Sequence, residues 1–211
     1  MTTAAKPRKR EGPEVRRQAI IDAAIVAIGE RGYFGFTIQD LARRCALTNG
    51  GVLYHFRTKE ELFLAVLVEY ERRMELALVA VAERFADEPR DRATRAKALA
   101  LLRGMVEQSA AEPELMRLFA VIQAEALHQA HPAFEYFDQL QHRIMAGLSR
   151  IVEALTVEPE AMARAIYALM MGLEYQWLRT EGGFDYLAEW DRAVVKLLPE
   201  DDWEEQARCA G

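Results

Sequence analysis

Apolar residues recur three and four positions apart along most of this chain, the spacing that places them on one face of an α-helix. The first run begins after Pro13, a residue suited to a first helical turn, and reaches Ile28. Later runs are separated by residues that interrupt helices, namely Pro89, Pro113, Pro132, Pro159 and Gly182-Gly183. The pattern predicts an all-α protein of about nine helices. Their expected ranges are 14 to about 30, 38–44, 48–54, 59 to about 85, 91–110, 114–130, 132–156, 160–180 and 184–198.

The stretch TNGGVLYHF, Thr48–Phe56, has a competing interpretation, because Asn49-Gly50 before a β-like tripeptide is a typical hairpin signal. A hairpin lacks a partner strand here, since residues 40–46 have helical spacing. Thr37 and Thr48 are N-cap candidates, and Thr58–Glu61 is a complete S/T-x-x-E capping box. We therefore expect two short helices joined by a turn of about three residues, which is the helix-turn-helix layout.

The second short helix has the residue types of a helix that enters a DNA groove. Thr48 caps N–H groups that can also hold a phosphate, and Asn49 can pair with a base edge. The two following glycines let the backbone approach DNA, although each costs about 1 kcal/mol of helix stability relative to alanine. Tyr54 and His55 can reach phosphates at the helix end, and Lys59 adds a cation.

Charge is distributed unevenly along the chain. Residues 1–63 hold 11 Lys/Arg against 7 Asp/Glu, whereas the remainder holds 16 against 26. A basic first third on an acidic body indicates a head that binds a polyanion. The basic segment Lys6–Arg10 is either an arm that contacts DNA or a solvated tail.

The cysteines and the hydropathy exclude several protein classes. Cys45 and Cys209 lie far apart and match neither a disulfide framework nor a zinc site. No uncharged apolar run reaches the length of about 18 residues that a membrane helix needs, and no apolar segment follows the basic N-terminus. We expect a soluble, cytoplasmic protein.

Residues 29–67, GERGYFGFTIQDLARRCALTNGGVLYHFRTKEELFLAVL, closely resemble the N-terminal domain of TetR/AcrR-type transcriptional regulators. The likeness extends over about residues 14–68. The matching positions are Gly32, Thr37, Leu41-Ala42, Thr48, Gly50, His55-Phe56, Lys59 and Leu62.

The resemblance implies a flexible basic arm at 1–13, a helix-turn-helix DNA-binding domain at 14–60, a ligand-binding and dimerisation domain at 61–199 and an acidic tail at 200–211. It implies a homodimer that binds double-stranded operator DNA, most often a repressor released by a small, largely apolar effector. No membrane contact, cofactor or catalytic activity is expected.

Three positions depart from the family pattern or fall on its variable part. Cys45-Ala46 replaces the usual alanine-glycine, so Ala46 is strained if its φ is positive. Leu53 replaces a tyrosine, and Tyr54 is expected to take over that phosphate contact. Gly51 falls on a variable, often base-facing position, so base readout rests on other side chains, including Gln39 or Arg44. The expected DNA-binding residues are Thr37, Arg44, Thr48, Asn49, Gly50, Gly51, Tyr54, His55 and Lys59.

The body contains two further predicted sites. The resemblance places a dimer interface on 160–180 and 184–198, and the alternative for their many apolar side chains is intrachain core. The expected interface residues are Met162, Ile166, Leu169, Leu173, Trp177, Phe184, Leu187, Trp190 and Val194. Methionines and aromatics suit an adaptable apolar cavity, although most of these residues are expected to be ordinary core. The expected pocket residues are Leu102, Met105, Phe119, Ile122, Gln123, Phe134, Phe137, Gln141, Met145 and Met170.

Other chemistry finds little support in the sequence. Glu125 and His128 have the spacing of a di-metal bundle, but no second Glu-x-x-His exists, so no metal site is expected. No nucleophile elbow or Gly-rich phosphate loop is present, which argues against an enzyme. Two alternatives stay open: a helical small-molecule-binding or metal-bundle protein without DNA function, and a DNA-binding dimer without an effector.

Overall fold

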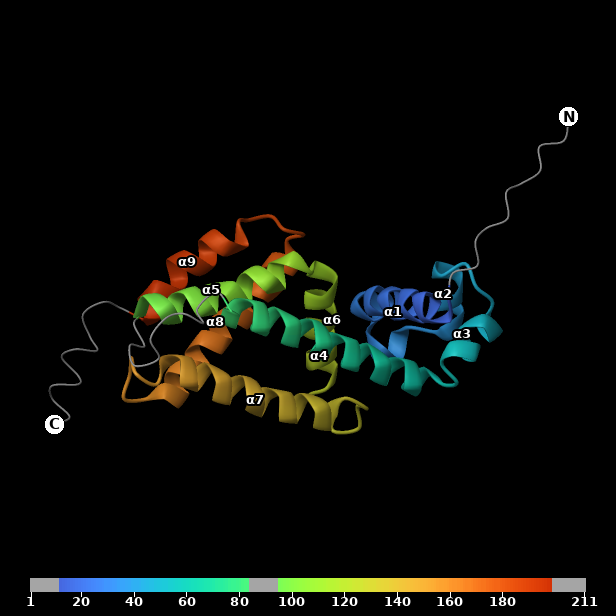
Figure 1. Cartoon of the computed structure of the whole chain (residues 1–211), viewed down its shortest axis with the longest axis horizontal. Helices are drawn as coiled ribbons and strands as arrows, with labels where there is room; N and C mark the ends of the chain where they lie inside the picture. The colour runs from blue at the N-terminus through green and yellow to red at the C-terminus, as the bar shows by residue number, and fades with distance from the viewer. Residues whose placement is uncertain (1–11, 84–94, 199–211) are drawn as a thin grey trace, which may run out of the picture.

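A computed structural model describes residues 12–83 and 95–198 of the chain, and these residues form helices joined by turns and loops (Figure 1). The predicted Lys6–Arg10 arm, the acidic tail and Cys209 lie outside the described residues. The helices are α1 (Pro13–Gly35), α2 (Ile38–Arg44), α3 (Asn49–His55), α4 (Lys59–Glu83), α5 (Arg95–Ala111), α6 (Pro113–Glu125), α7 (Phe134–Val152), α8 (Pro159–Arg179) and α9 (Tyr186–Leu197). The all-α prediction is confirmed.

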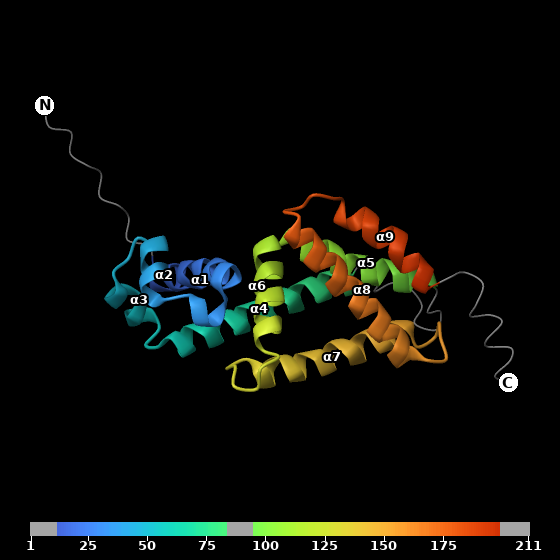
Figure 2. The same cartoon turned by 180° about the vertical axis from the view of Figure 1, so that it is seen from behind.

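Helices α1–α3 and the start of α4 form a head at one end of the elongated molecule, and α5–α9 form a body at the other (Figures 1 and 2). The predicted caps set these helix starts. The Thr37 hydroxyl accepts a hydrogen bond from the Asp40 N–H at 3.1 Å, and Thr48 accepts one from Gly51 at 3.0 Å. Thr58 accepts one from Glu61 at 3.0 Å. Each cap satisfies an N–H that the helix itself leaves free.

Helix α1 is longer than predicted because it continues past a kink at Gly32, whose φ is +72°. A Cβ at this position would lie 1.9 Å from Oε1 of Glu125, so only glycine fits here. The next residue, Tyr33, donates its backbone N–H to Oε2 of Glu125 at 2.8 Å. The kink therefore fixes the end of α1 against the end of α6.

Two hydrophobic cores fill the molecule. The first joins the head to α6 and to the start of α7, through residues such as Ile28, Phe56, Leu118 and Phe137. The second lies among α5–α9 and surrounds the fully buried Trp190. The first core thus crosses the domain boundary predicted near residue 60. No helix in the part of the chain that the structure describes is long and apolar enough to cross a membrane.

Candidate nucleic-acid interface and ligand cavity

Helix α3 presents one face to solvent and the other to the head. Val52 and Phe56 are fully buried and anchor the helix. On the outer face Asn49 and Gly50 are exposed, and the Tyr54 side chain is 82% exposed. Leu53, at the family's usual tyrosine position, is 41% exposed. The outer face therefore offers one amide and one phenol to a partner.

The two glycines of α3 are not required by packing within this chain. A Cβ at Gly50 would meet nothing closer than 3.9 Å, and one at Gly51 would meet only ordinary contacts from 3.4 Å. Since each glycine weakens a helix by about 1 kcal/mol, their presence favours a surface that another molecule approaches closely.

Three arginines of the head, Arg31, Arg43 and Arg44, are held by neighbouring carboxylates. Asp40 binds both Arg43 and Arg31, the latter at 2.8 Å. Arg44 pairs with Glu30, which turns this predicted DNA contact toward α1. Arg57, which follows the C-cap of α3, is exposed, and its guanidinium makes no ion pair with the described residues. Sequence reasoning did not single out Arg57, although its place after the helix is a usable signal.

Lys59 is partly withdrawn from the surface. Its Nζ donates to the carbonyl of Phe36 at 2.9 Å and lies 4.7 Å from the ring centroid of Tyr33. Burial is the main reason that the pKa of Lys59 is lowered. This lysine therefore holds the loop before α2 to the start of α4, whatever it contacts outside the chain. Thr37 likewise has a local role as the cap of α2.

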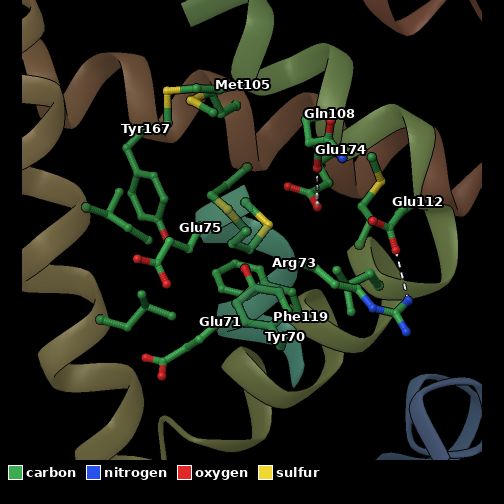
Figure 3. Close-up of a pocket in the computed structure, with 18 of the residues that line it drawn as sticks. Tyr70, Glu71, Arg73, Glu75, Met105, Gln108, Glu112, Phe119, Tyr167 and Glu174 are labelled. Atoms are coloured by element: carbon green, nitrogen blue, oxygen red, sulfur yellow. Dashed lines mark hydrogen bonds and ion pairs between the residues drawn. The ribbon is translucent and has the colours of Figure 1, made fainter. Parts of the chain in front are cut away.

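A cavity of about 410 Å³ lies in the body, surrounded by α4, α5, α6, α7 and α8 (Figure 3). The apolar part of its wall consists of methionines, aliphatic residues and the rings of Tyr70, Phe119 and Tyr167. The rings of Tyr70 and Phe119 stack with centroids 5.3 Å apart. The volume is within the range of small-molecule sites, roughly 300–1,000 Å³.

Three of the ten predicted pocket residues line this cavity: Met105, Phe119 and Met170. Leu102 and Ile122 are instead completely buried in the two cores, and Phe137 is buried in the first. Gln123 lies behind the wall, where it donates to the Tyr167 hydroxyl at 2.8 Å. The remaining three do not line the cavity: Met145 packs against the second core, Phe134 is half-buried and Gln141 is exposed.

The cavity lining contains two arginines, and both are occupied. Arg73 on α4 bonds to Glu69 at 2.7 Å, to Glu112 at 3.0 Å and to Asp22 at 2.5 Å. Arg143 on α7 bonds to Glu71 at 2.6 Å. These ion pairs neutralise two of the cavity's carboxylates.

Glu174 on α8 is the unusual carboxylate of the cavity. Its side chain is 7% exposed, and its one hydrogen bond comes from the Ser109 hydroxyl at 3.5 Å. Burial raises its pKa to about 7, and the bond from Ser109 opposes this shift. Perturbed carboxylates in cavities are candidates for functional groups.

Sequence reasoning missed Glu174 together with Tyr70, Arg73, Glu112 and Tyr167. The pocket was predicted mainly from residues 91–156, whereas α4 and α8 supply a large part of its wall. One signal was available on α8: Tyr167, Met170, Met171 and Glu174 have the i, i+3, i+4, i+7 spacing of one helix face, which places a carboxylate on an apolar stripe.

The cavity and the head share two connections. Arg73 lines the cavity and bonds to Asp22 on α1. Helix α6 contributes Phe119 to the cavity, and its last residue, Glu125, accepts the Tyr33 N–H of α1. Glu125 also lies 3.4 Å from Nε2 of His131. Helices α4 and α6 therefore each contact both the cavity and α1.

The nine residues predicted for the dimer interface lie on α8, on α9 and between them. Ile166, Trp190 and Val194 are buried within this chain and present no surface to a partner. The other six are partly buried against the second core: Met162, Leu169, Leu173, Trp177, Phe184 and Leu187. Helices α8 and α9 nevertheless pack side by side at the edge of the body (Figure 2).

The family described as "Bacterial regulatory proteins, tetR family" matches residues 20–66. These residues include α2, α3 and most of the residues that the head contributes to the first core. The chain is 27% identical over 175 residues to the HTH-type transcriptional regulator BetI of Serratia proteamaculans, covering 79% of this chain and 81% of that one. It is 28% identical to BetI of Stenotrophomonas maltophilia, covering 82% and 84%.

Solved structures share the whole architecture. The fatty acid degradation regulator FadR of Bacillus halodurans has a TM-score of 0.68 at 16% identity, covering 92% of this chain and 100% of that one. AibR, solved with isovaleryl coenzyme A and operator DNA, has a TM-score of 0.64 at 20% identity, covering 87% and 98%. At these identities the likeness concerns the fold.

Proposed function

We propose that the chain, which by its likeness to the TetR family is a ligand-responsive, DNA-binding transcriptional regulator, acts as a dimeric repressor. A small molecule that enters the cavity releases it from its operator. The observation that carries the proposal is the double attachment of α4 and α6, each of which lines the cavity and holds α1 of the head.

On DNA, the outer face of α3 lies in the major groove. Asn49 pairs with a base edge, Gly50 and Gly51 allow close approach of the backbone, and Tyr54 reaches a phosphate or base at the helix end. Arg57 adds a phosphate contact that is independent of sequence. With α8 and α9 of two copies packed together, the two α3 helices read half-sites about one helical turn apart.

Release follows from the arrangement around Arg73. An effector in the cavity separates α4 from α6 and so changes the distance between Arg73 and its partners on α1 and before α6. The head then turns relative to the body, and the spacing of the two α3 helices no longer matches the operator. Such a switch requires that the effector bind this state more tightly than the DNA-bound state.

The test is an electrophoretic mobility shift assay with the region upstream of the chain's own gene. A specific complex at moderate salt, competed by unlabelled target but not by random DNA, is the expected result. Weak binding that depends strongly on salt and has no sequence preference would overturn the regulator function.

A compound that stabilises the protein in a thermal shift assay should then dissociate the protein–DNA complex. Failure of every stabilising compound to do so would favour a DNA-binding dimer without an effector.

A further inference from the structure

Glu174 is a buried carboxylate without a compensating cation in the described part of the chain. Its Oε1 accepts the long bond from Ser109, and no hydrogen bond reaches Oε2 from the described residues. The side chain extends from α8 into the cavity (Figure 3). A buried ionised carboxylate is unfavourable unless it is paired and hydrogen-bonded.

Glu69 shows how the same protein treats a buried carboxylate that has a structural role. Glu69 is 6% exposed, close to the value for Glu174. It receives bonds of 2.8 Å from Arg72 and 2.7 Å from Arg73, which satisfy both of its oxygens. Among the described residues Glu174 has no such cation, so its second oxygen is open to a ligand that enters the cavity.

The rest of the cavity favours a positively charged ligand over an anionic one. Its lining has four carboxylates, Glu71, Glu75, Glu112 and Glu174, against the two guanidiniums of Arg73 and Arg143. Both guanidiniums already bind carboxylates, so their positive charge is largely compensated before a ligand enters. Aromatic faces, which attract cations, belong to Tyr70, Phe119 and Tyr167 in the same wall.

We propose that the effector is a protonated amine with an apolar body, whose N–H group donates to the free oxygen of Glu174. The apolar body lies among the methionines and rings, and the charge supplies the cation that Glu174 lacks among the described residues. This inference rests on the proposed function, because it assigns the chemical class of the effector for that cavity.

Two matched probe series test the class of ligand: decylamine, decanol and decanoate, and naphthylmethylamine, naphthylmethanol and naphthoate. Their dissociation constants for the full chain are measured by isothermal titration calorimetry. In each series that binds, the amine should bind about 10- to 100-fold more tightly than the alcohol, as expected for a charge-assisted hydrogen bond. Equal or tighter binding of the alcohol or the carboxylate overturns the inference.

Three substitutions locate the effect. Glu174→Gln should abolish the preference for the amine, whereas Glu71→Gln, which removes the same charge from the same cavity, should change amine affinity by about 2-fold or less because Glu71 is already paired. Glu174→Asp keeps the charge and should keep some preference for the amine. Equal losses in Glu71→Gln and Glu174→Gln would reduce the effect to general charge and overturn the role of Glu174.

The mobility shift assay separates this inference from the proposed function. Amine binding that depends on Glu174 but leaves the DNA complex intact would support the cavity chemistry and contradict release by this effector. Release of DNA by the alcohols or carboxylates, with no preference for amines, would support the repressor and contradict the amine.

Discussion

The head and the cavity each contain one unfavourable feature, and the two features differ in kind. In the head it is conformational: Ala46, in the turn between α2 and α3, has φ of +52°, a left-handed conformation that costs about 1–2 kcal/mol outside glycine. In the cavity it is electrostatic: Glu174 is buried, and no cation in the described part of the chain pairs with it. The strain at Ala46 is compensated within the chain, whereas Glu174 can be compensated by a ligand.

The difference between Ala46 and Glu174 indicates that the turn between α2 and α3 keeps one conformation, whereas the cavity responds to a ligand. The turn at Ala46 is fixed by hydrogen bonds from Ala46 N to Arg43 O at 3.2 Å and from Leu47 N to Ala42 O at 2.8 Å. These bonds hold the angle between α2 and α3 constant. The described residues leave one oxygen of Glu174 without a hydrogen bond, so binding there can change the relative energies of two states.

The largest expected effect is that of removing Arg73, the cation that compensates the other buried carboxylate. Arg73→Met leaves Glu69 with Arg72 alone and breaks the bonds to Glu112 and Asp22. The free energy of unfolding should fall by about 4 kcal/mol, measured by urea denaturation. The control is Arg143→Met, whose half-exposed pair with Glu71 should cost less than about 1 kcal/mol. Similar losses for both variants would contradict the importance assigned to Arg73.

The second effect is the pH dependence that Glu174 adds to stability. Its pKa is about 7 in the folded protein and 4.5 ordinarily, so the folded state binds more protons between these values. The resulting stability is fully present below about pH 4.5 and is lost as the pH rises through 7. Relative to Glu174→Gln, the wild-type protein should lose about 3 kcal/mol of unfolding free energy between about pH 4.5 and pH 8. Parallel stability curves for the two proteins would show that Glu174 is not strained by burial.

The head was largely predictable from sequence because its determinants are local. Caps at Thr37, Thr48 and Thr58 depend on residues three positions away, and the boundaries of α2 match the prediction. The positive φ that would strain Ala46 is also observed. The pairing of Arg44 with Glu30 was not predicted, because Glu30 lies on another helix.

The cavity was poorly predictable because five helices meet around it. Whether an apolar residue lines the cavity or fills a core depends on the rotation of its helix and on distant neighbours. Leu102 and Met105 are close on α5, yet the first is fully buried in the second core and the second lines the cavity. Sequence periodicity gives the buried face of each helix but not the place where facing side chains leave a space.

A third, smaller effect distinguishes base readout from phosphate contact in the head. Asn49→Ala should weaken binding to the operator by about 10- to 100-fold and leave binding to a scrambled duplex nearly unchanged, measured by fluorescence anisotropy. Arg57→Ala should weaken both duplexes alike and reduce the salt dependence. Arg57 is a cleaner control than Lys59, whose Nζ holds the Phe36 carbonyl. Equal losses on both duplexes for Asn49→Ala would remove it from base readout.

The smallest effect concerns the strained turn itself. Ala46→Gly relieves the left-handed strain but adds freedom to the unfolded chain, so the net gain in unfolding free energy should be only about 0.5–1 kcal/mol. Ala42→Gly, in the regular part of α2, is the matched control and should lose stability, since a buried helical methyl is removed. Urea denaturation of both variants measures the difference. DNA affinity of Ala46→Gly should stay within about 2-fold of wild type, because the hydrogen bonds that set the turn use backbone atoms only. A loss of stability at position 46 would mean that the turn is not strained, and the head would then contain no counterpart to Glu174.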